Sequence, residues 1–222
     1  FSIFAGVEKT LLNKTIKQPL VRLIDVEMTE CMAEWCVAHV LRYHLDLDDY
    51  IKSVKKVNDN PSKLIKRLSK KIGDNEFILV TGHRRENFGE GIENICKSII
   101  SISRLNSNVQ IVYPVHLNPQ IKQPVQSLLK EKKNIFLIEP QDYLSFCYLM
   151  LRSRLILSDS GGIQEEAITL KRPVLVMREF TERQEALKSG AVKLVGSSQK
   201  KIVDSVNELL RDEKQYNSMI LK

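Results

Sequence analysis

The hydrophobic residues after position 76 fall into two alternating patterns. Runs such as FILV at 77–80 are apolar at every position, which is typical of strands buried on both faces of a sheet. Other segments repeat apolar residues every three or four positions, as Ile92, Ile95 and Ile99 do, and this spacing predicts helices. Strands are predicted at 77–82, 109–115, 135–140, 154–160, 173–177 and 191–196, and helices at 91–105, 121–132, 143–153, 162–170 and 199–212.

Strands and helices that alternate in this way predict an α/β fold, a Rossmann-like parallel sheet with helices on both faces. The connections between its strands should be right-handed crossovers. In such sheets ligands bind beyond the carboxyl ends of the strands. That rule points to the segments directly after the strands, where Gly, His, Arg, Asn and acidic residues concentrate: TGHRREN, PVHLNP, EPQ, SDSGG and MREFTER.

The first 76 residues follow a different pattern. A long, mainly apolar helix is predicted over 28–44, and 46–60 has the composition of a linker. A further helix is predicted over 60–73, with Asn60 as its cap and Gly73 at its end.

The composition is that of an ordinary folded protein, with 43% hydrophobic and 27% charged residues in 222. No apolar run approaches the roughly 18 residues that a membrane helix needs, so no membrane partner is expected. The four cysteines form no C-x-x-C pair, which argues against a zinc site and fits a reducing cytoplasm. Free, buried cysteines are therefore expected.

The formal net charge is +7, and the basic surplus lies wholly in residues 51–222. Such a surplus suits a phosphate-bearing ligand or a nucleic acid. The densest basic cluster, at 63–71, has the spacing of a solvated helix face. We therefore expect a phosphate-bearing ligand and no nucleic acid.

The segment DSGGIQEEA has the features of a phosphate-binding turn. Gly161 and Gly162 let the backbone approach a ligand closely, and the helix that follows offers unpaired N–H groups to an anion. Ser160 is expected to cap this helix. Glu165 and Glu166 are expected in its first turn, where one would face the ligand and hold a ribose. A plain capped helix, with the acids complementing its dipole, is an equal alternative.

Two further segments place histidine and arginine after strands. His83, Arg84 and Glu86 follow the first strand within five residues, and arginine clamps phosphate with two donors. A histidine there can bond or protonate a departing phosphate oxygen. His116 follows the next strand, with a structural role as its alternative. A solvated loop is the alternative reading for the first segment.

The segment TERQEA follows the fifth predicted strand. Thr181 can cap a helix there while Glu182 or Arg183 lines the site. Taken alone, this signal is weak.

Together these motifs resemble the C-terminal half of bacterial non-hydrolysing UDP-N-acetylglucosamine 2-epimerases. The resemblance is collinear over about residues 51–222 and rests on ILVTGHRRENFGEGIENIC, IVYPVHLNPQ, DSGGIQEEA, PVLVMREFTERQEA and AVKLVG. It implies half of a GT-B-like fold that binds UDP, and no metal or other cofactor. The implied reaction interconverts UDP-GlcNAc and UDP-ManNAc through elimination and re-addition of UDP.

The resemblance also implies roles for single residues. His83 would be catalytic, at the diphosphate. UDP would be bound by Arg84, Glu86, His116, Ser160, Gly161, Gly162, Glu165, Glu166 and Arg183. Gln184 stands where the family usually has proline, which should alter the helix start more than the ligand site.

Residues 1–50 lack the acidic motifs of the family's N-terminal domain. They resemble instead a segment of NAD(P)-dependent 2-hydroxyacid dehydrogenases, through FAGVEKTLL, PLVRLID and MTECMAEWCVAHVLRYH, without that family's dinucleotide turn. We therefore expect two parts, 1–50 and 51–222, and a partial epimerase chain that keeps mainly the UDP-binding half. The alternatives are an inactive UDP-binding module and another GT-B-like glycosyltransferase. A homodimer is left open.

Overall fold

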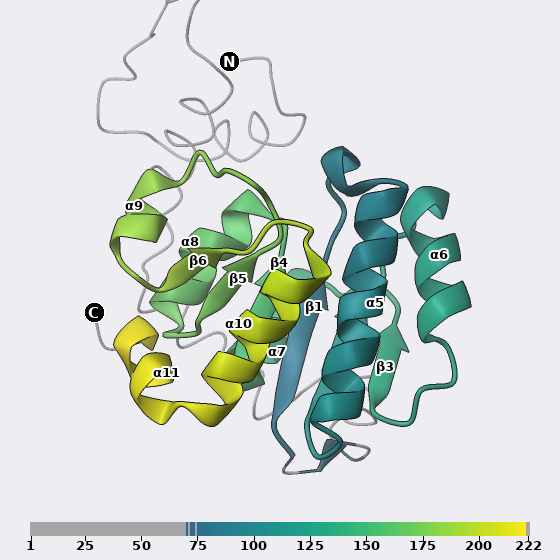
Figure 1. Cartoon of the computed structure of the whole chain (residues 1–222), viewed down its shortest axis with the longest axis horizontal. Coiled ribbons are helices and arrows are strands. Elements are labelled where there is room, and N and C mark those ends of the chain that lie inside the picture. Colours follow the sequence, from purple (N-terminus) through teal and green to yellow (C-terminus); the bar gives the residue numbers. More distant parts are fainter. Residues whose placement is uncertain (1–69, 71, 74, 221–222) are drawn as a thin grey trace, which may run out of the picture. The chain divides into compact units, whose positions relative to one another are not determined.

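The computed structural model describes residues 70, 72, 73 and 75–220 of the chain. They form a six-stranded sheet in which every neighbouring pair of strands is parallel. The strand order is β3-β2-β1-β4-β5-β6 (Figure 1). The strands are β1 (Phe77–Thr81), β2 (Gln110–Pro114), β3 (Ile135–Ile138), β4 (Leu155–Ser158), β5 (Val174–Val176) and β6 (Val192–Leu194).

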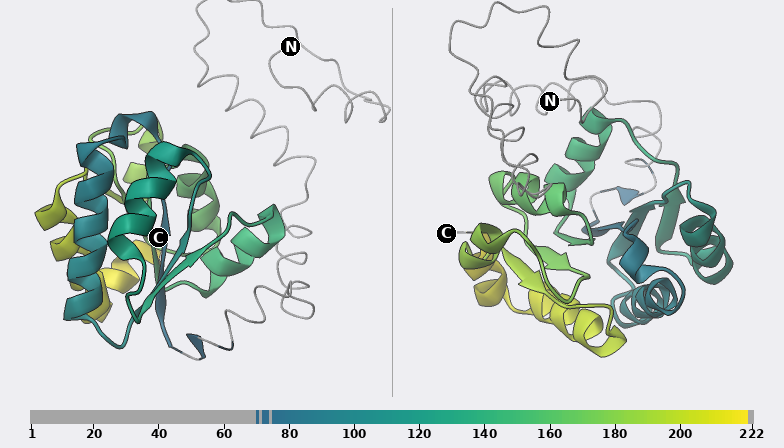
Figure 2. Two further views of the ribbon diagram at one scale, coloured as in Figure 1. Left: turned by 90° about the vertical axis from the view of Figure 1, so that its right-hand side faces the viewer. Right: turned by 90° about the horizontal axis from the view of Figure 1, so that it is seen from above.

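Helices cover both faces of the sheet, which confirms the predicted Rossmann-like α/β fold (Figure 2). One face packs against α5 (Glu90–Leu105), α6 (Pro119–Leu129), α10 (Gln199–Arg211) and α11 (Glu213–Ile220). The other packs against α7 (Tyr143–Arg152), α8 (Gly161–Thr169) and α9 (Gln184–Lys188).

Strands β1 to β5 each contribute to two separate hydrophobic cores, whereas β6 contributes only to the core under α7 and α8. Ile78 and Val80 of β1 belong to the core under α5, whereas Phe77 and Leu79 belong to the core under α7 and α8. This division follows from the alternation of side chains along a strand. It explains why the strands are apolar at every position rather than at every second one.

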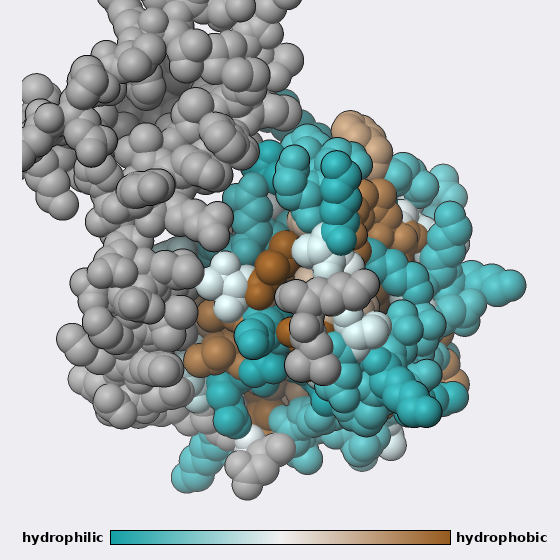
Figure 3. Space-filling view, turned by 90° about the vertical axis from the view of Figure 1, so that its left-hand side faces the viewer, coloured by the Kyte–Doolittle hydropathy of each residue, from teal (hydrophilic) through white to brown (hydrophobic). Residues whose placement is uncertain are grey.

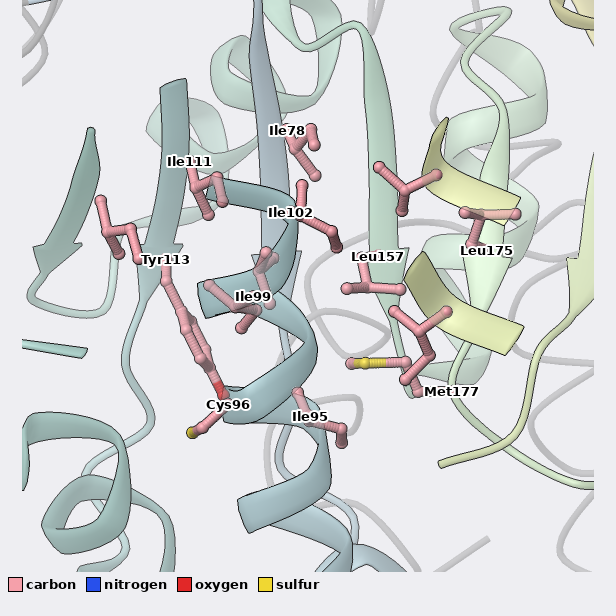
Figure 4. Packing of buried hydrophobic residues seen from close by; sticks show 14 of the residues in the cluster. Ile78, Ile95, Cys96, Ile99, Ile102, Ile111, Tyr113, Leu157, Leu175 and Met177 are labelled. Carbon is pink, nitrogen blue, oxygen red and sulfur yellow. The ribbon is translucent and has the colours of Figure 1, made fainter. Parts of the chain in front are cut away.

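The core under α5 is closely filled (Figure 4). Ile95, Cys96 and Ile99 of α5 are fully buried, and the ring of Tyr113 reaches along the helix toward Cys96. Burial raises the pKa of the Cys96 thiol to about 12, with a smaller contribution from Glu93. Cys96 is therefore a protonated core residue at neutral pH, as expected for the cysteines of this chain.

The strand order contains a switch point between β1 and β4. The helix after β1, α5, covers one face of the sheet, and the helix after β4, α8, covers the other. The segments that leave these two strands therefore diverge, and in doubly wound sheets ligands bind in the space that this divergence opens. The GHRREN and DSGG segments both lie at this point.

The helix boundaries that differ most from their prediction are those of α6. The helix expected at 121–132 starts two residues earlier, at Pro119, and ends at Leu129. Its start is fixed by Asn118, whose side-chain oxygen accepts the backbone N–H of Gln120 at 3.0 Å. Proline fits the first helical position because its missing N–H would have no partner there.

A second difference is an additional helix, α11, directly after α10. Asp212 ends α10, and its carboxylate accepts the backbone N–H of Lys214 at 2.9 Å, which caps the new helix. Arg154 attaches α11 to the sheet by pairing with Glu213 and by lying 3.5 Å from the ring centre of Tyr216. The prediction stopped at 212 because these contacts join distant parts of the chain.

Several predictions concern residues outside the described part of the chain. They include the N-terminal segment 1–50 with its dehydrogenase-like motifs, the helix at 28–44 and nearly all of the helix at 60–73. Within the described residues, no helix is long and apolar enough to span a membrane. The face shown in Figure 3 is mainly hydrophilic where it is described, with smaller hydrophobic patches.

Candidate functional site

Asp159 joins the two sides of the switch point. It directly follows β4, and only 1% of the residue is exposed. Its carboxylate accepts the backbone N–H groups of His83 and Arg84, each at 3.0 Å. It also accepts the side-chain amide of Asn87 at 3.1 Å. The position of the GHRREN loop is therefore fixed by the residue that precedes the Ser-Gly-Gly turn.

His83 and His116 come together at this edge of the sheet. Their rings stack with centres 5.8 Å apart, and Nδ1 of His83 lies 3.5 Å from Oδ1 of Asp159. Burial lowers the pKa of His83 below its usual 6.5, and His116 and Arg84 act in the same direction while Asp159 opposes them. A neutral imidazole at pH 7 offers one donor and one acceptor.

The Ser-Gly-Gly turn forms the start of α8. Ser160 is the N-cap residue as predicted, but its side chain makes no capping hydrogen bond. Its backbone N–H donates instead to Oγ of Ser158 at 3.0 Å. Gly161 is buried, whereas a Cβ added at Gly162 would have no atom within 4 Å. The second glycine therefore leaves the backbone of the first turn accessible.

The two acids of DSGGIQEEA lie in the second turn of α8, so their predicted place in the first turn is wrong. The helix begins at Gly161, one residue earlier than expected, which moves Glu165 from the fourth to the fifth helical position, whereas Glu166 lies in the second turn with either start. Glu165 pairs with Nε of Arg183 at 2.7 Å. Burial raises the pKa of Glu166 above its usual 4.5, a hydrogen bond from Tyr143 opposes this, and Glu165 adds to it.

Thr181 has a different role from the predicted cap. Helix α9 begins three residues later, with Arg183 as its N-cap residue. The Thr181 hydroxyl donates to Oε1 of Gln164 at 2.8 Å and accepts the backbone N–H of Arg183 at 3.1 Å. Since Gln164 is fully buried in α8, Thr181 holds the Arg183 segment against that helix.

The start of α9 also accommodates the unusual Gln184. This residue occupies the first helical position, and its side-chain amide donates to the carbonyl of Thr181 at 2.7 Å. Proline would suit the same position but could not make this bond. The hydrogen bond of Gln184 thus belongs to the helix start, and its effect on the ligand site stays a prediction.

A buried arginine, Arg178, connects two of the segments. Its side chain is 5% exposed, and it lies between Glu86 at 2.7 Å and Glu182 at 2.8 Å. The other oxygen of Glu182 lies 3.5 Å from Nη2 of Arg84. Arg178 and Glu182 thus link the GHRREN loop to the segment after β5.

Two guanidinium groups flank the first turn of α8. A Cβ added at Gly161 would lie 3.4 Å from Nη2 of Arg84 and 3.8 Å from Nη2 of Arg183. A helix N-terminus carries unpaired N–H groups and the positive end of the helix dipole. Together with two arginines, it can bind a multiply charged anion such as a diphosphate.

Asp159, Asn87, Gln164 and Arg178 support this arrangement and were not predicted. All four are buried polar side chains, with exposures between 0 and 6%. Their positions next to strands or glycines were visible in the sequence, but each of them has a partner that is 17 to 92 residues away. A charged residue directly after an apolar strand, as Asp159 is, was the available signal.

Comparison with known proteins identifies the family. Residues 44–221 match the family described as UDP-N-acetylglucosamine 2-epimerase. The UDP-N-acetylglucosamine 2-epimerase of Salmonella typhimurium is 57% identical over 144 residues, which cover 65% of this chain and 38% of the relative. The probable UDP-N-acetylglucosamine 2-epimerase of Ralstonia solanacearum is 57% identical over 148 residues, 67% of this chain and 40% of that protein.

A solved structure gives the same result. The crystal structure of UDP-GlcNAc 2-epimerase from Neisseria meningitidis bound to UDP-GlcNAc superposes with a TM-score of 0.70 at 45% identity, covering 76% of this chain and 46% of that one. The matched part is thus less than half the length of these relatives. Because the family match spans most of the chain, the protein belongs to the UDP-N-acetylglucosamine 2-epimerase family.

Proposed function

We propose that the described domain binds the UDP part of a UDP-N-acetylhexosamine at the switch point between β1 and β4. The observation that carries this proposal is the convergence of Arg84 and Arg183 on the first turn of α8, beside Gly161. A diphosphate placed there would meet two guanidinium groups and the helix N-terminus. The family match and the relative bound to UDP-GlcNAc support the same ligand class.

In this proposal the remaining predicted residues surround the diphosphate and the nucleoside. His83, held by Asp159 and stacked on His116, donates a hydrogen bond or a proton to the departing phosphate oxygen. Glu166 accepts the ribose hydroxyls, with Glu165 holding Arg183 beside it. Glu86 acts through Arg178 and does not touch the ligand.

The reaction we propose for the complete enzyme is epimerisation at C2 of UDP-GlcNAc through elimination and re-addition of UDP, in the cytoplasm. Elimination requires a base at C2 and stabilisation of the UDP that departs. In this proposal Arg84, Arg183 and His83, with the first turn of α8, stabilise the departing UDP. We therefore propose that this chain alone binds UDP weakly and turns over poorly.

Calorimetric titration of the 222-residue chain with UDP, uridine and inorganic pyrophosphate tests the proposed site. UDP and pyrophosphate should bind and uridine should bind much less, because the arginines recognise the diphosphate. Arg183→Ala should weaken UDP binding by roughly tenfold or more. Arg104→Ala, at an exposed position at the end of α5, is the matched control and should leave the titration unchanged.

No heat from UDP with the parent chain, under conditions where it is folded, would remove the site assignment. Conversion of UDP-GlcNAc to UDP-ManNAc is measured on the same sample. A rate near that of a full-length relative would contradict the proposal that this chain alone turns over poorly.

A further inference from the structure

Glu182 occupies the place next to the helix N-terminus that an anion would take. Its Oε1 lies 3.1 Å from the position of a Cβ added at Gly161, the first residue of α8. The same oxygen lies 3.5 Å from Nη2 of Arg84. A carboxylate at the first turn of a helix makes the same kind of contact that a phosphate oxygen makes.

The two arginines that Glu182 contacts hold it unequally. Arg178 is buried and binds the other oxygen, Oε2, at 2.8 Å, so this side of the carboxylate is firmly anchored. Arg84 is only 3.5 Å from Oε1, its side chain is 36% exposed, and its buried Nε has no hydrogen-bond partner among the described residues. Arg84 is therefore the arginine that can leave Glu182 at low cost.

Charge in the cluster is already balanced by these internal pairs. Arg178 has Glu86 and Glu182, Arg183 has Glu165, and Arg84 has Glu182. An incoming diphosphate adds at least two negative charges to a region without surplus positive charge. To bind Nη2 of Arg84 it must compete with Oε1 of Glu182, and it then lies near a like charge.

Glu182 is charged under ordinary conditions. Burial alone would raise its pKa, but a hydrogen bond from its own backbone and the guanidinium groups of Arg178 and Arg84 outweigh burial and lower the pKa below 4.5. The repulsion of a bound diphosphate by Glu182 therefore persists across the neutral range.

We propose that Glu182 is an internal competitor for the diphosphate, a carboxylate that holds Arg84 when the site is empty and reduces the affinity of the site for UDP. This inference rests on the proposed function, because it assigns Glu182 a role at the same UDP site. It makes an unusual prediction, since removal of a charged residue from a binding site should tighten binding.

The test is titration of the 222-residue chain and its Glu182→Gln variant with UDP and with inorganic pyrophosphate. Glutamine keeps the shape and can still accept a hydrogen bond from Arg178, but it carries no charge. We expect both ligands to bind about tenfold more tightly to the variant. Equal or weaker binding to a folded variant would overturn the proposal.

A control variant tests whether the gain in UDP affinity comes from the loss of a charged partner of Arg178 rather than from the loss of Glu182 itself. Glu86→Gln also removes one charged partner of Arg178, yet among the described residues Glu86 forms an ion pair with Arg178 and none with Arg84. Its unfolding midpoint should fall about as much as that of Glu182→Gln, without an equal gain in UDP affinity. An equal gain would trace the effect to Arg178 and overturn the proposal.

The double variant Arg84→Ala/Glu182→Gln completes a mutant cycle on UDP affinity. Because the competition is for Arg84, Glu182→Gln should give a smaller gain when Arg84 is already absent, and the gain that remains measures the direct repulsion between Glu182 and the diphosphate. A full tenfold gain in that background would contradict the mechanism. If the parent chain and every variant fail to bind UDP, the proposed function itself fails, whereas binding by the parent without a gain in Glu182→Gln rejects this inference alone.

Discussion

The carboxylate of Asp159 accepts the backbone N–H of His83 at 3.0 Å, across 76 residues of sequence. This contact joins the segment after β4 to the segment after β1, at the point where the connections of the sheet diverge. It joins His83, the catalytic candidate, to the Ser-Gly-Gly turn that we propose as the phosphate site. The site thus depends on a residue that need not touch the ligand.

Replacement of Asp159 by alanine should destabilise the domain by about 2–4 kcal/mol. The change leaves the N–H groups of His83 and Arg84 and the amide of Asn87 without their acceptor. Urea unfolding measures the effect. Glu208→Ala, which removes an exposed ion pair with Lys193, is the control and should cost about 1 kcal/mol or less. Similar losses in both variants would contradict the structural role of Asp159.

Much of the fold was predictable because strands buried on both faces must be apolar throughout, as Phe77 to Val80 are. The general place of the site was predictable because strand ends in a parallel sheet share one edge. The pairing of Asp159 with His83 was not, because it requires β1 and β4 to be neighbours and the apolar runs do not specify strand order. The error on Glu165 had a smaller cause, a helix start misplaced by one residue.

Gly162→Ala should separate binding from stability. Among the described residues, the new methyl group meets no atom within 4 Å apart from its chain neighbours and its own helix backbone, so the free energy of unfolding should change by about 1 kcal/mol or less. It would occupy space beside the first turn of α8 through which a phosphate approaches the backbone, so UDP affinity should fall about tenfold or more. Calorimetry and urea unfolding of the same sample measure the two effects.

Thr169→Ala, at the opposite end of α8, is the control for this variant. It should leave UDP affinity unchanged. If Gly162→Ala binds UDP as tightly as the parent, the ligand does not approach this turn.

Gly196→Ala should show the opposite behaviour, a loss of stability without a direct effect on the ligand. Gly196 has φ +61°, and a Cβ there would lie 2.2 Å from Oε1 of Glu179. The exposed Glu179 side chain can move away, but the left-handed backbone would still cost about 1–2 kcal/mol. Urea unfolding measures this loss. A Glu179→Ala background should recover only the part due to the clash, and full recovery would contradict the backbone argument.

Titration of His83 should show a pKa below 6.5. Burial of the imidazole is the main cause, and His116 and Arg84 add to it, so the unfolded chain binds a proton more readily than the folded one. Neutral His83 therefore contributes fully to the free energy of unfolding above its unfolded-state pKa. This contribution is lost as the pH falls from about 6.5 through the folded-state pKa. Relative to His83→Gln, the parent chain should therefore lose stability in this acidic window.

Two variants identify the causes of the His83 shift by NMR titration. His116→Gln should raise the pKa of His83, because the stacked ring then carries no positive charge at low pH. Asp159→Asn should lower it further, because the carboxylate 3.5 Å from Nδ1 is the group that favours the protonated form. Opposite shifts in the two variants are thus expected from one imidazole. If the pKa of His83 rises in the Asp159→Asn variant instead, the loop has moved and His83 is more exposed to water. The hydrogen bonds by which Asp159 holds the loop would then affect this pKa more than its charge does.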